Sequence, residues 1–341
     1  MIVWTDSCQR NQSDSTVQRA YWSWAFGAGW RATGGRNNGN MNYANVVGYP
    51  RVPPPSGDTF IGFVRHLRNT GADGPFFSCL LGGAQQVALC TLSNGGLSVV
   101  RNGTLMAQTG GALVEGTILH GYAIKVKLHS SAGTVEVWMD GVRLTALDFT
   151  GNTIGQSISG TPSPTWDSFH VGQSAGGGNS TWCDLMVADS TNPSGSDVHD
   201  LVPDVCIDYR KPTASGYSSQ FVGFDGDSVN NYLYVDDNSA PDTNVATSDT
   251  DWVQSTAAAI DAYAIQDHPV TGATILGRTA IAVARKTTTG VSNLRVGMRT
   301  SGVNTMGTSV GILTTYGEVR ANLPPQSEAN FNASEVVVEL L

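Results

Sequence analysis

The sequence predicts an all-β protein built from two domains. Apolar and polar residues alternate over 118–149, which is the periodicity of half-buried strands. Similar short runs recur roughly every ten residues and end at Gly or Asn, as in sandwiches and barrels. The 341 residues include 40 glycines but only 19 Lys and Arg, and long surface helices usually carry many lysines. The length favours two domains over one.

The first segment, residues 1–50, is dense in aromatic residues set among Gly and Asn. Its rings are Trp4, Tyr21, Trp22, Trp24, Phe26, Trp30, Tyr43 and Tyr49. Trp and Tyr usually bury their ring bodies and hydrogen-bond at the polar tip, so burial is the favoured interpretation. Exposed rings that bind a glycan are the alternative. The candidate contacts are then Trp22, Trp24, Trp30 and, later in the chain, Trp166.

Residues 59–100 predict four strands joined by tight turns. The apolar runs are 60–64, 76–81, 86–92 and 97–100. Asn94 and Asn102 each precede Gly, which is hairpin-turn chemistry because both residue types tolerate positive φ. Cys79 and Cys90 lie in two of these runs, and we expect small buried thiols there. The five cysteines show no CxxC spacing, so neither a disulfide framework nor a zinc site is predicted.

Residues 118–149 predict two consecutive hairpins. Ile124, Val126 and Leu128 alternate with Lys125, Lys127 and His129, and after a turn Val135, Val137 and Met139 alternate with Glu136, Trp138 and Asp140. The apolar set should line a core, since successive side chains on a strand point to opposite faces. On the wet face we expect an ion pair between the lysines and Glu136. Asp140 and Gly141 supply the second turn.

The rest of the chain continues the strand pattern. Residues 168–172 and 181–189 are the last predicted strands of the first domain, which we place at 1–210. The second domain, 211–341, alternates at 274–283 and 294–298. Its stretch 255–265 contains helix-compatible alanines but is interpreted as a strand because β-forming residues flank it.

Several of these motifs resemble a family. They are 19–22 (RAYW), 60–63 (FIGF), 133–141 (GTVEVWMDG), 152–153 and 183–189 (CDLMVAD), followed in the second half by 230–231, 249–253, 261–263, 284–286 and 316–341. Their order is similar to that in tailed-bacteriophage virion structural proteins with a concanavalin A-like, laminin-G-like jelly-roll domain. Cys183 stands where that group usually has an acid. The resemblance implies an N-terminal jelly-roll β-sandwich followed by a smaller β-rich domain.

The resemblance also implies a role. It indicates a non-enzymatic structural protein on the exterior of the virion, as capsid decoration or cement or as a tail-associated accessory protein. Its partners would be other virion proteins and copies of itself in a homo-oligomer. We expect synthesis in the host cytoplasm before assembly. The alternative is a carbohydrate-binding host-adhesion module of the phage tail, and a glycoside hydrolase is the less favoured third class.

Charge and hydropathy exclude two kinds of partner. The formal net charge is −9 and Lys and Arg form no cluster, so no nucleic-acid partner is expected. No apolar run approaches the ~20 residues that span a bilayer, so no membrane insertion is expected.

Motifs that could carry catalysis have simpler explanations. The G-x-S-x-G match at 172–176 is followed by Gly, whereas a nucleophile elbow needs a helix there. Glu136 and Asp140 are the nearest glycanase-like pair, but at strand rise they would lie about 13 Å apart, against about 5 Å for a retaining pair. The six histidines are scattered without metal or triad spacing. No residue is nominated as catalytic.

Calcium is the one cofactor that the acids suggest, and it is ranked below solvated turn acids. The candidates are Asp184 and Asp189 in the first domain and Asp225, Asp227, Asp236, Asp237 and Asp242 in the second. None has EF-hand spacing. We therefore predict no cofactor and no metal ligand.

Overall fold

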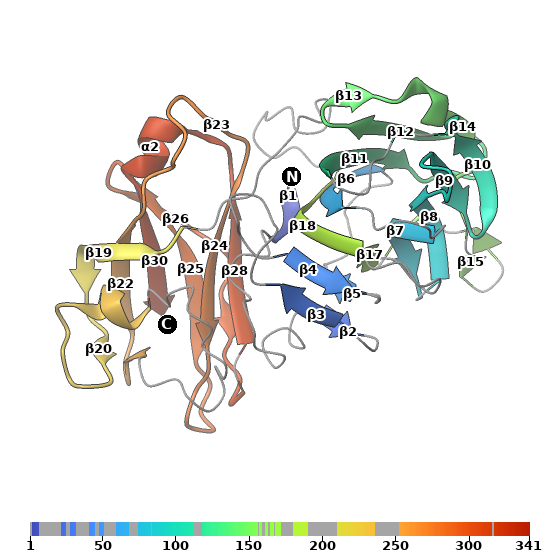
Figure 1. Cartoon of the computed structure of the whole chain (residues 1–341). Coiled ribbons are helices and arrows are strands. Elements are labelled where there is room, and N and C mark those ends of the chain that lie inside the picture. Colours follow the sequence, from blue (N-terminus) through green and yellow to red (C-terminus); the bar gives the residue numbers. More distant parts are fainter. Residues whose placement is uncertain are drawn as a thin grey trace. The chain divides into compact units, whose positions relative to one another are not determined.

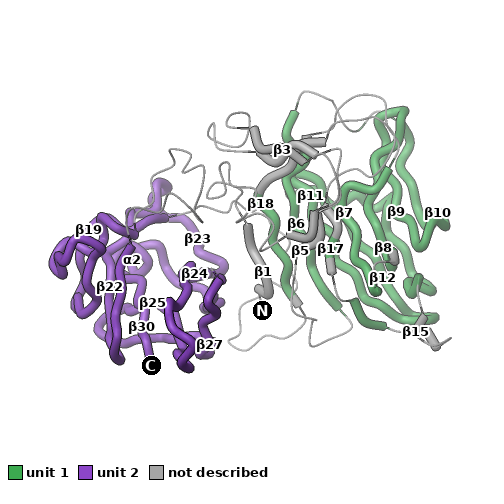
Figure 2. Tube along the Cα trace, turned by 90° about the horizontal axis from the view of Figure 1, so that it is seen from below, with its two compact units in different colours: residues 1–208 green, residues 209–341 purple. Residues whose placement is uncertain are grey.

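The computed structural model divides the chain into two compact units, residues 1–208 and 209–341 (Figure 2). The boundary placed from the sequence lies at 210–211. The structure describes residues 2–6, 22–24, 28–31, 41–44, 48–50, 59–67, 74–82, 84–111, 113, 118–155, 157–158, 161–162, 164–166, 168–171, 180–189, 210–235, 252–315 and 317–341.

The first unit is built from two antiparallel sheets (Figure 1). One sheet has the order β13 (Val142–Arg143), β12 (Gly133–Met139), β11 (Leu119–Lys127), β6 (Thr59–Leu67), β18 (Ser180–Asp189), β4 (Met41–Ala44) and β3 (Ala28–Arg31), with β1 (Ile2–Asp6) on β18 and β14 (Phe149–Gly151) on β12. The other has the order β10 (Thr104–Gln108), β9 (Leu97–Arg101), β8 (Ala84–Thr91), β7 (Gly74–Leu81), β17 (Ser168–Val171), β5 (Gly48–Pro50) and β2 (Trp22–Trp24). A short hairpin, β15 (Ser157–Ile158) with β16 (Thr161–Pro162), and a 3-10 turn, η2 (Thr145–Leu147), complete the described elements.

A single apolar core joins the two sheets of this unit into a sandwich. The core side chains that the nine-stranded sheet contributes include Phe60, Val64, Tyr122, Ile124, Val126, Val135 and Val137, and those from the other sheet include Phe76, Phe77, Val87, Leu89, Leu97, Val99 and Phe169. They alternate along their strands with residues of the opposite face, as strand geometry requires. The predicted all-β class, with a jelly-roll sandwich in the first domain, is confirmed.

The predicted details of this core hold where the structure describes them. Ile124, Val126 and Val137 are buried, as the alternation predicted. Cys79 and Cys90 are buried, and burial raises the pKa of the Cys79 thiol to about 12. The sequence therefore identified the inward face of these strands correctly.

The central hairpins also form as predicted. β11 and β12 pair with Lys125 opposite Glu136. Asp140 and Gly141 have φ values of 49° and 78°, the conformation of a tight two-residue turn. Glu136 contacts Arg143, with 3.1 Å between Oε1 and Nη2. The expected ion pair from the lysines to Glu136 stays a prediction.

The second unit is a smaller β structure with its own core. Its main sheet has the order β19 (Pro212–Ser219), β22 (Ala259–Ile265), β30 (Glu335–Leu340), β25 (Asn293–Thr300) and β26 (Val303–Met306), with β27 (Val310–Gly311) on β25. Two-stranded pairs are β20 (Val222–Gly223) with β21 (Val253–Gln254), β23 (Thr274–Ile275) with β29 (Gln326–Ser327), and β24 (Arg278–Ala284) with β28 (Gly317–Leu323). Val296 of β25 and Val319 of β28 belong to one apolar cluster, so the β24–β28 pair packs on the main sheet.

The second unit contains one strand that the sequence predicted ambiguously and a short helix that it did not predict. The ambiguous stretch 255–265 is a strand over Ala259–Ile265, as predicted. A short helix, α2 (Glu328–Asn332), was not predicted. It begins at Ser327, whose side chain accepts a hydrogen bond from the backbone N–H of Asn330 at 3.3 Å. The other described helical segment of this unit is the 3-10 turn η4 (Asn231–Tyr234). None of the helices among the described residues is long and apolar enough to cross a membrane.

Candidate functional site

The four tryptophans predicted as glycan contacts divide into two groups. Trp22 and Trp24 lie on β2 and Trp30 lies on β3, but their side chains are outside the described structure. Trp166 is only 1% exposed, and its ring centroid lies 4.1 Å from that of Phe169. The prediction for Trp166 is therefore wrong, because a ring that fills the core between two sheets cannot stack on a sugar.

The structure describes some of the acids that were considered as calcium ligands, and others lie outside the described residues. Asp184 lies in a bulge of β18 with φ 51°, and its Oδ2 is 3.2 Å from Nε of Arg65 in a buried ion pair. Among the described residues, no group of three His, Cys, Asp or Glu side chains could hold a metal ion. The side chain of Asp189, the acids Asp236, Asp237 and Asp242, and the G-x-S-x-G match at 172–176 lie outside the described residues.

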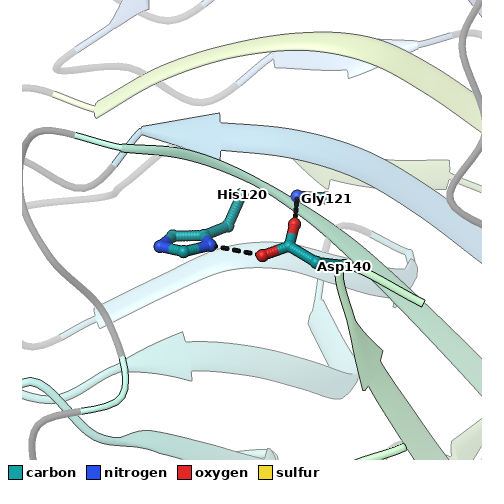
Figure 3. A network of polar contacts seen from close by, with 3 residues as sticks. All are labelled: His120, Gly121 and Asp140. Atoms are coloured by element: carbon teal, nitrogen blue, oxygen red, sulfur yellow. Dashed lines mark hydrogen bonds and ion pairs between the residues drawn. The ribbon is translucent and has the colours of Figure 1, made fainter. Parts of the chain in front are cut away.

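His120, near the start of β11, and Asp140, just after the end of β12, form a polar contact (Figure 3). The Asp140 carboxylate accepts from Nδ1 of His120 at 2.6 Å and from the backbone N–H of Gly121 at 2.8 Å. His120 is 9% exposed, and its Nε2 has no hydrogen-bond partner among the described residues. The ring packs edge-on against Tyr122 with 6.2 Å between centroids. This pair ties the start of β11 to the turn after β12, and we assign it a structural role.

The surface of the second unit holds a more specific arrangement, three aromatic rings in mutual contact. Phe224 follows β20 and Trp252 precedes β21, and the Phe224 N–H donates to the Trp252 carbonyl at 3.0 Å. Their ring centroids are 5.6 Å apart, and the ring of Tyr234 from η4 stands edge-on to Phe224 at 5.3 Å. Phe224 is 45% exposed and Trp252 is 42% exposed. We call Phe224, Tyr234 and Trp252 the aromatic platform.

A carboxylate is held at the edge of the aromatic platform. Asp225 accepts from the Tyr234 hydroxyl at 2.6 Å and from the Asp227 N–H at 2.9 Å. The hydrogen bond from Tyr234 lowers the pKa of Asp225 below its usual value, and the same bond raises the pKa of Tyr234 to about 12. Asp225 is therefore an anion at neutral pH, and Tyr234 is a fixed donor.

The backbone beneath Tyr234 needs a glycine. A Cβ atom added at Gly223 would contact the Tyr234 ring, with Cδ2 at 2.7 Å, and would also come within 3.0 Å of Oδ1 of Asp225. Real Cβ atoms do not approach so closely. The absence of a side chain at Gly223 therefore allows the Tyr234 ring to reach Asp225.

A buried carboxylate holds the segments that carry these rings. Asp261 on β22 is 0% exposed and accepts four hydrogen bonds. The donors are the N–H groups of Gln220 and Phe221 at 2.5 and 2.8 Å, Nδ2 of Asn231 at 2.6 Å and the hydroxyl of Tyr263 at 2.8 Å. Burial, and then the charge of Asp261, raise the pKa of Tyr263, so its hydroxyl stays a donor. Asp261 thus links residues 220–221, which precede β20 and Phe224, to the 3-10 turn that carries Tyr234.

Sequence reasoning missed the aromatic platform as a unit. It singled out Trp252 as part of a family motif and as a β-forming residue beside 255–265, and it named Asp225 as a candidate calcium ligand ranked below a solvated turn acid. The closest local signal was the sequence of 223–227, Gly-Phe-Asp-Gly-Asp, which places an apolar ring inside a turn. Turn residues are usually polar, so a Phe there indicates a contact made elsewhere in the fold.

Comparison with known proteins shows remote similarity only. The sequence matches no protein-family model and no curated protein. Among solved structures, a Trypanosoma rangeli sialidase is 14% identical with a TM-score of 0.34, over 56% of this chain and 31% of that one. The GH131 β-glucanase catalytic domain from Podospora anserina is 8% identical with a TM-score of 0.34, and the carbohydrate recognition domain of Emp46p in its potassium-bound form is 8% identical with a TM-score of 0.33.

Each of the last two matches covers 56% of this chain and 97% of the other. The chain spans less than a third of the length of the sialidases that it matches. Likenesses this remote assign neither an activity nor a ligand.

Proposed function

We propose that this protein is a non-enzymatic structural protein of a bacteriophage virion, located on the particle exterior as capsid decoration or as a tail-associated accessory protein. The motif order described above supports the virion setting. The observation that carries a binding role is the aromatic platform, because Phe224, Trp252 and Asp225 are exposed and the segments around them are held by a buried network. Such a surface is suited to recognition. Other virion proteins and copies of this chain are the proposed partners.

A second candidate is a carbohydrate-binding host-adhesion module of the phage tail. The aromatic platform favours it specifically, since glycan recognition combines apolar rings with a few fixed polar groups. The two candidates differ in where the chain sits and in how many copies a particle carries.

Electron cryo-microscopy of purified particles tests both candidates. Many copies arranged on the capsid lattice would support decoration, and a few copies at the tail tip would support adhesion. Absence of the chain from particles, checked by mass spectrometry of the same preparation, would contradict the proposal. An assay for new reducing ends on host polysaccharide tests the non-enzymatic part, and release of sugar would contradict it.

A further inference from the structure

We propose that the aromatic platform of the second unit is a binding site for uncharged or amino-bearing pyranose rings, with Asp225 accepting sugar hydroxyls, and that it rejects anionic sugars. This inference rests on the second candidate function. It places the glycan site around Phe224 and Trp252, in the second unit.

The rings have the chemistry that a sugar needs. A pyranose presents a face of C–H groups that carry partial positive charge, and the face of an aromatic ring is negative, so the two stack. Phe224 and Trp252 are tilted by 48° with centroids 5.6 Å apart, and each is more than two-fifths exposed. Two exposed rings tilted in this way offer apolar surface on which a sugar can stack.

The polar groups beside the rings select the kind of sugar. Oδ2 of Asp225 accepts from the Tyr234 hydroxyl and Oδ1 accepts from the Asp227 N–H, and a carboxylate oxygen can accept more than one hydrogen bond. Asp227 adds a second carboxylate next to it, and its Oδ1 accepts from the Val229 N–H at 2.8 Å. Sugar hydroxyls or a sugar ammonium can donate to these oxygens, whereas a uronate or sialate carboxylate would meet two like charges.

The site is organised before any ligand arrives. The hydrogen bond from Tyr234 orients Asp225, Gly223 leaves room for the Tyr234 ring, and Asp261 holds both flanking segments. Little conformational entropy is then lost on binding, which raises the affinity of a small contact surface. Asp261 and Gly223 are positioning residues, because they act through the platform and do not touch the ligand.

The test uses the full chain and three soluble hexasaccharides of matched length: cellohexaose, fully deacetylated chitohexaose and hexagalacturonate. Isothermal titration calorimetry should show binding of the neutral or the amino hexamer and no binding of the anionic one. Trp252→Ala and Phe224→Ala should each weaken binding about tenfold or more. Leu313→Ala is the matched control, since Leu313 is a 65% exposed apolar residue of the same unit, and it should bind as the parent does.

A conservative variant keeps the test informative if an aromatic replacement unfolds the unit. Asp225→Asn should weaken binding of the amino hexamer more than that of the neutral one, and it should reduce the discrimination against hexagalacturonate. An unchanged thermal melting curve would show that the effect is local.

Four results would overturn the inference. They are failure of all three hexamers to bind at about 10 mM, equal binding by the Trp252→Ala variant, tight binding of hexagalacturonate, and concentration-dependent self-association that Trp252→Ala abolishes. The last result would assign the platform to a contact between copies of this chain. None of these results depends on whether the chain is found in particles, so the virion proposal and the glycan site can fail independently.

Discussion

Asp261 is a buried carboxylate that holds the segments of the aromatic platform in place, although it is not itself at the surface. A carboxylate at 0% exposure is costly unless its lone pairs are satisfied, and four donors meet them here. Those donors come from three separate stretches of the second unit. The demand of one residue for hydrogen bonds therefore fixes the relative positions of segments that carry the platform.

Asp261→Asn should lower the free energy of unfolding by about 2–4 kcal/mol, because an amide cannot accept all four bonds and its N–H₂ would face other donors. Urea unfolding followed by circular dichroism measures the change. Asp267→Asn is the control, since Asp267 is an exposed acid of the same unit. Equal stability of the two variants would show that the network contributes nothing to folding.

The hydrogen bond between Tyr234 and Asp225 should make the stability of the protein depend on pH. The pKa of Tyr234 is raised to about 12 from an ordinary 10.0, so the stabilising effect of this bond is complete below pH 10 and is lost as pH rises through about 12. The pKa of Asp225 is lowered from 3.8, so on the acid side the effect is complete above pH 3.8 and is lost only below it. Stability from this pair should be flat between those limits.

Ultraviolet titration of tyrosinate measures the alkaline side. The difference between the parent and Tyr234→Phe should show one group that titrates near pH 12. In an Asp225→Asn background that group should move toward 10.0, because the carboxylate that stabilises the protonated phenol is gone. If the titration midpoint of Tyr234 does not move in this background, Asp225 is not the cause of the raised pKa of Tyr234.

At the scale of elements, the contact between the two sheets of the first unit depends on a glycine. Gly62 lies on β6 beneath the ring of Phe77 on β7, and an added Cβ would overlap that ring, with Cε1 at 2.7 Å. The ring lies so close to the strand that only a residue without a side chain fits. Sheet packing here is therefore set by one large and one absent side chain.

Gly62→Ala should cost about 1–3 kcal/mol, since overpacking forces the ring or the strand to move. Thermal unfolding of the purified chain gives the change in stability. Gly110→Ala is the matched control, because an added Cβ there meets nothing within 4 Å. If both variants melt alike, the sheets are free to separate slightly at this point.

The His120–Asp140 contact belongs to the same scale. The two residues are 20 positions apart and come together because β11 pairs with β12 and the turn at 140–141 folds back. Tyr122 and Met139 are the last paired residues before that turn. The contact therefore depends on the register of β11 and β12, and it joins the start of β11 to the end of β12.

At the scale of the whole molecule, each unit has a core of its own. Among the described residues, the cluster around Val296 is built from residues of the second unit and the cluster around Phe60 from residues of the first. A unit with its own core can fold alone when it is large enough to bury apolar surface. The chain is thus expected to behave as two separable folding units.

Residues 210–341 expressed alone should unfold cooperatively and should keep the dispersed amide spectrum of a folded domain. Differential scanning calorimetry and two-dimensional NMR of this fragment provide the measurement. The tyrosinate titration of Tyr234 is a second check, because it reports on the platform itself. A fragment that remains unfolded would mean that the second unit needs the first.

The sequence by itself determined the class of fold and the inward faces of its strands. The alternation of Ile124, Val126 and Leu128 with polar neighbours is a local property, and so is the turn chemistry of Asp140 and Gly141. Both follow from the two-residue period of a strand and from the conformations that Asp and Gly allow. The structure confirms both predictions: Ile124, Val126 and Leu128 are buried, and Asp140 and Gly141 have positive φ.

Only the tertiary structure decided which rings are buried and which are exposed. Trp166 and Trp252 each lie shortly before a strand, β17 and β21, yet one is 1% exposed and the other 42%. The difference depends on what packs over each ring: Phe60 and Phe169 cover Trp166, while Phe224 meets Trp252 from one side. Burial is set by contacts between residues far apart in the chain, and local periodicity does not encode them.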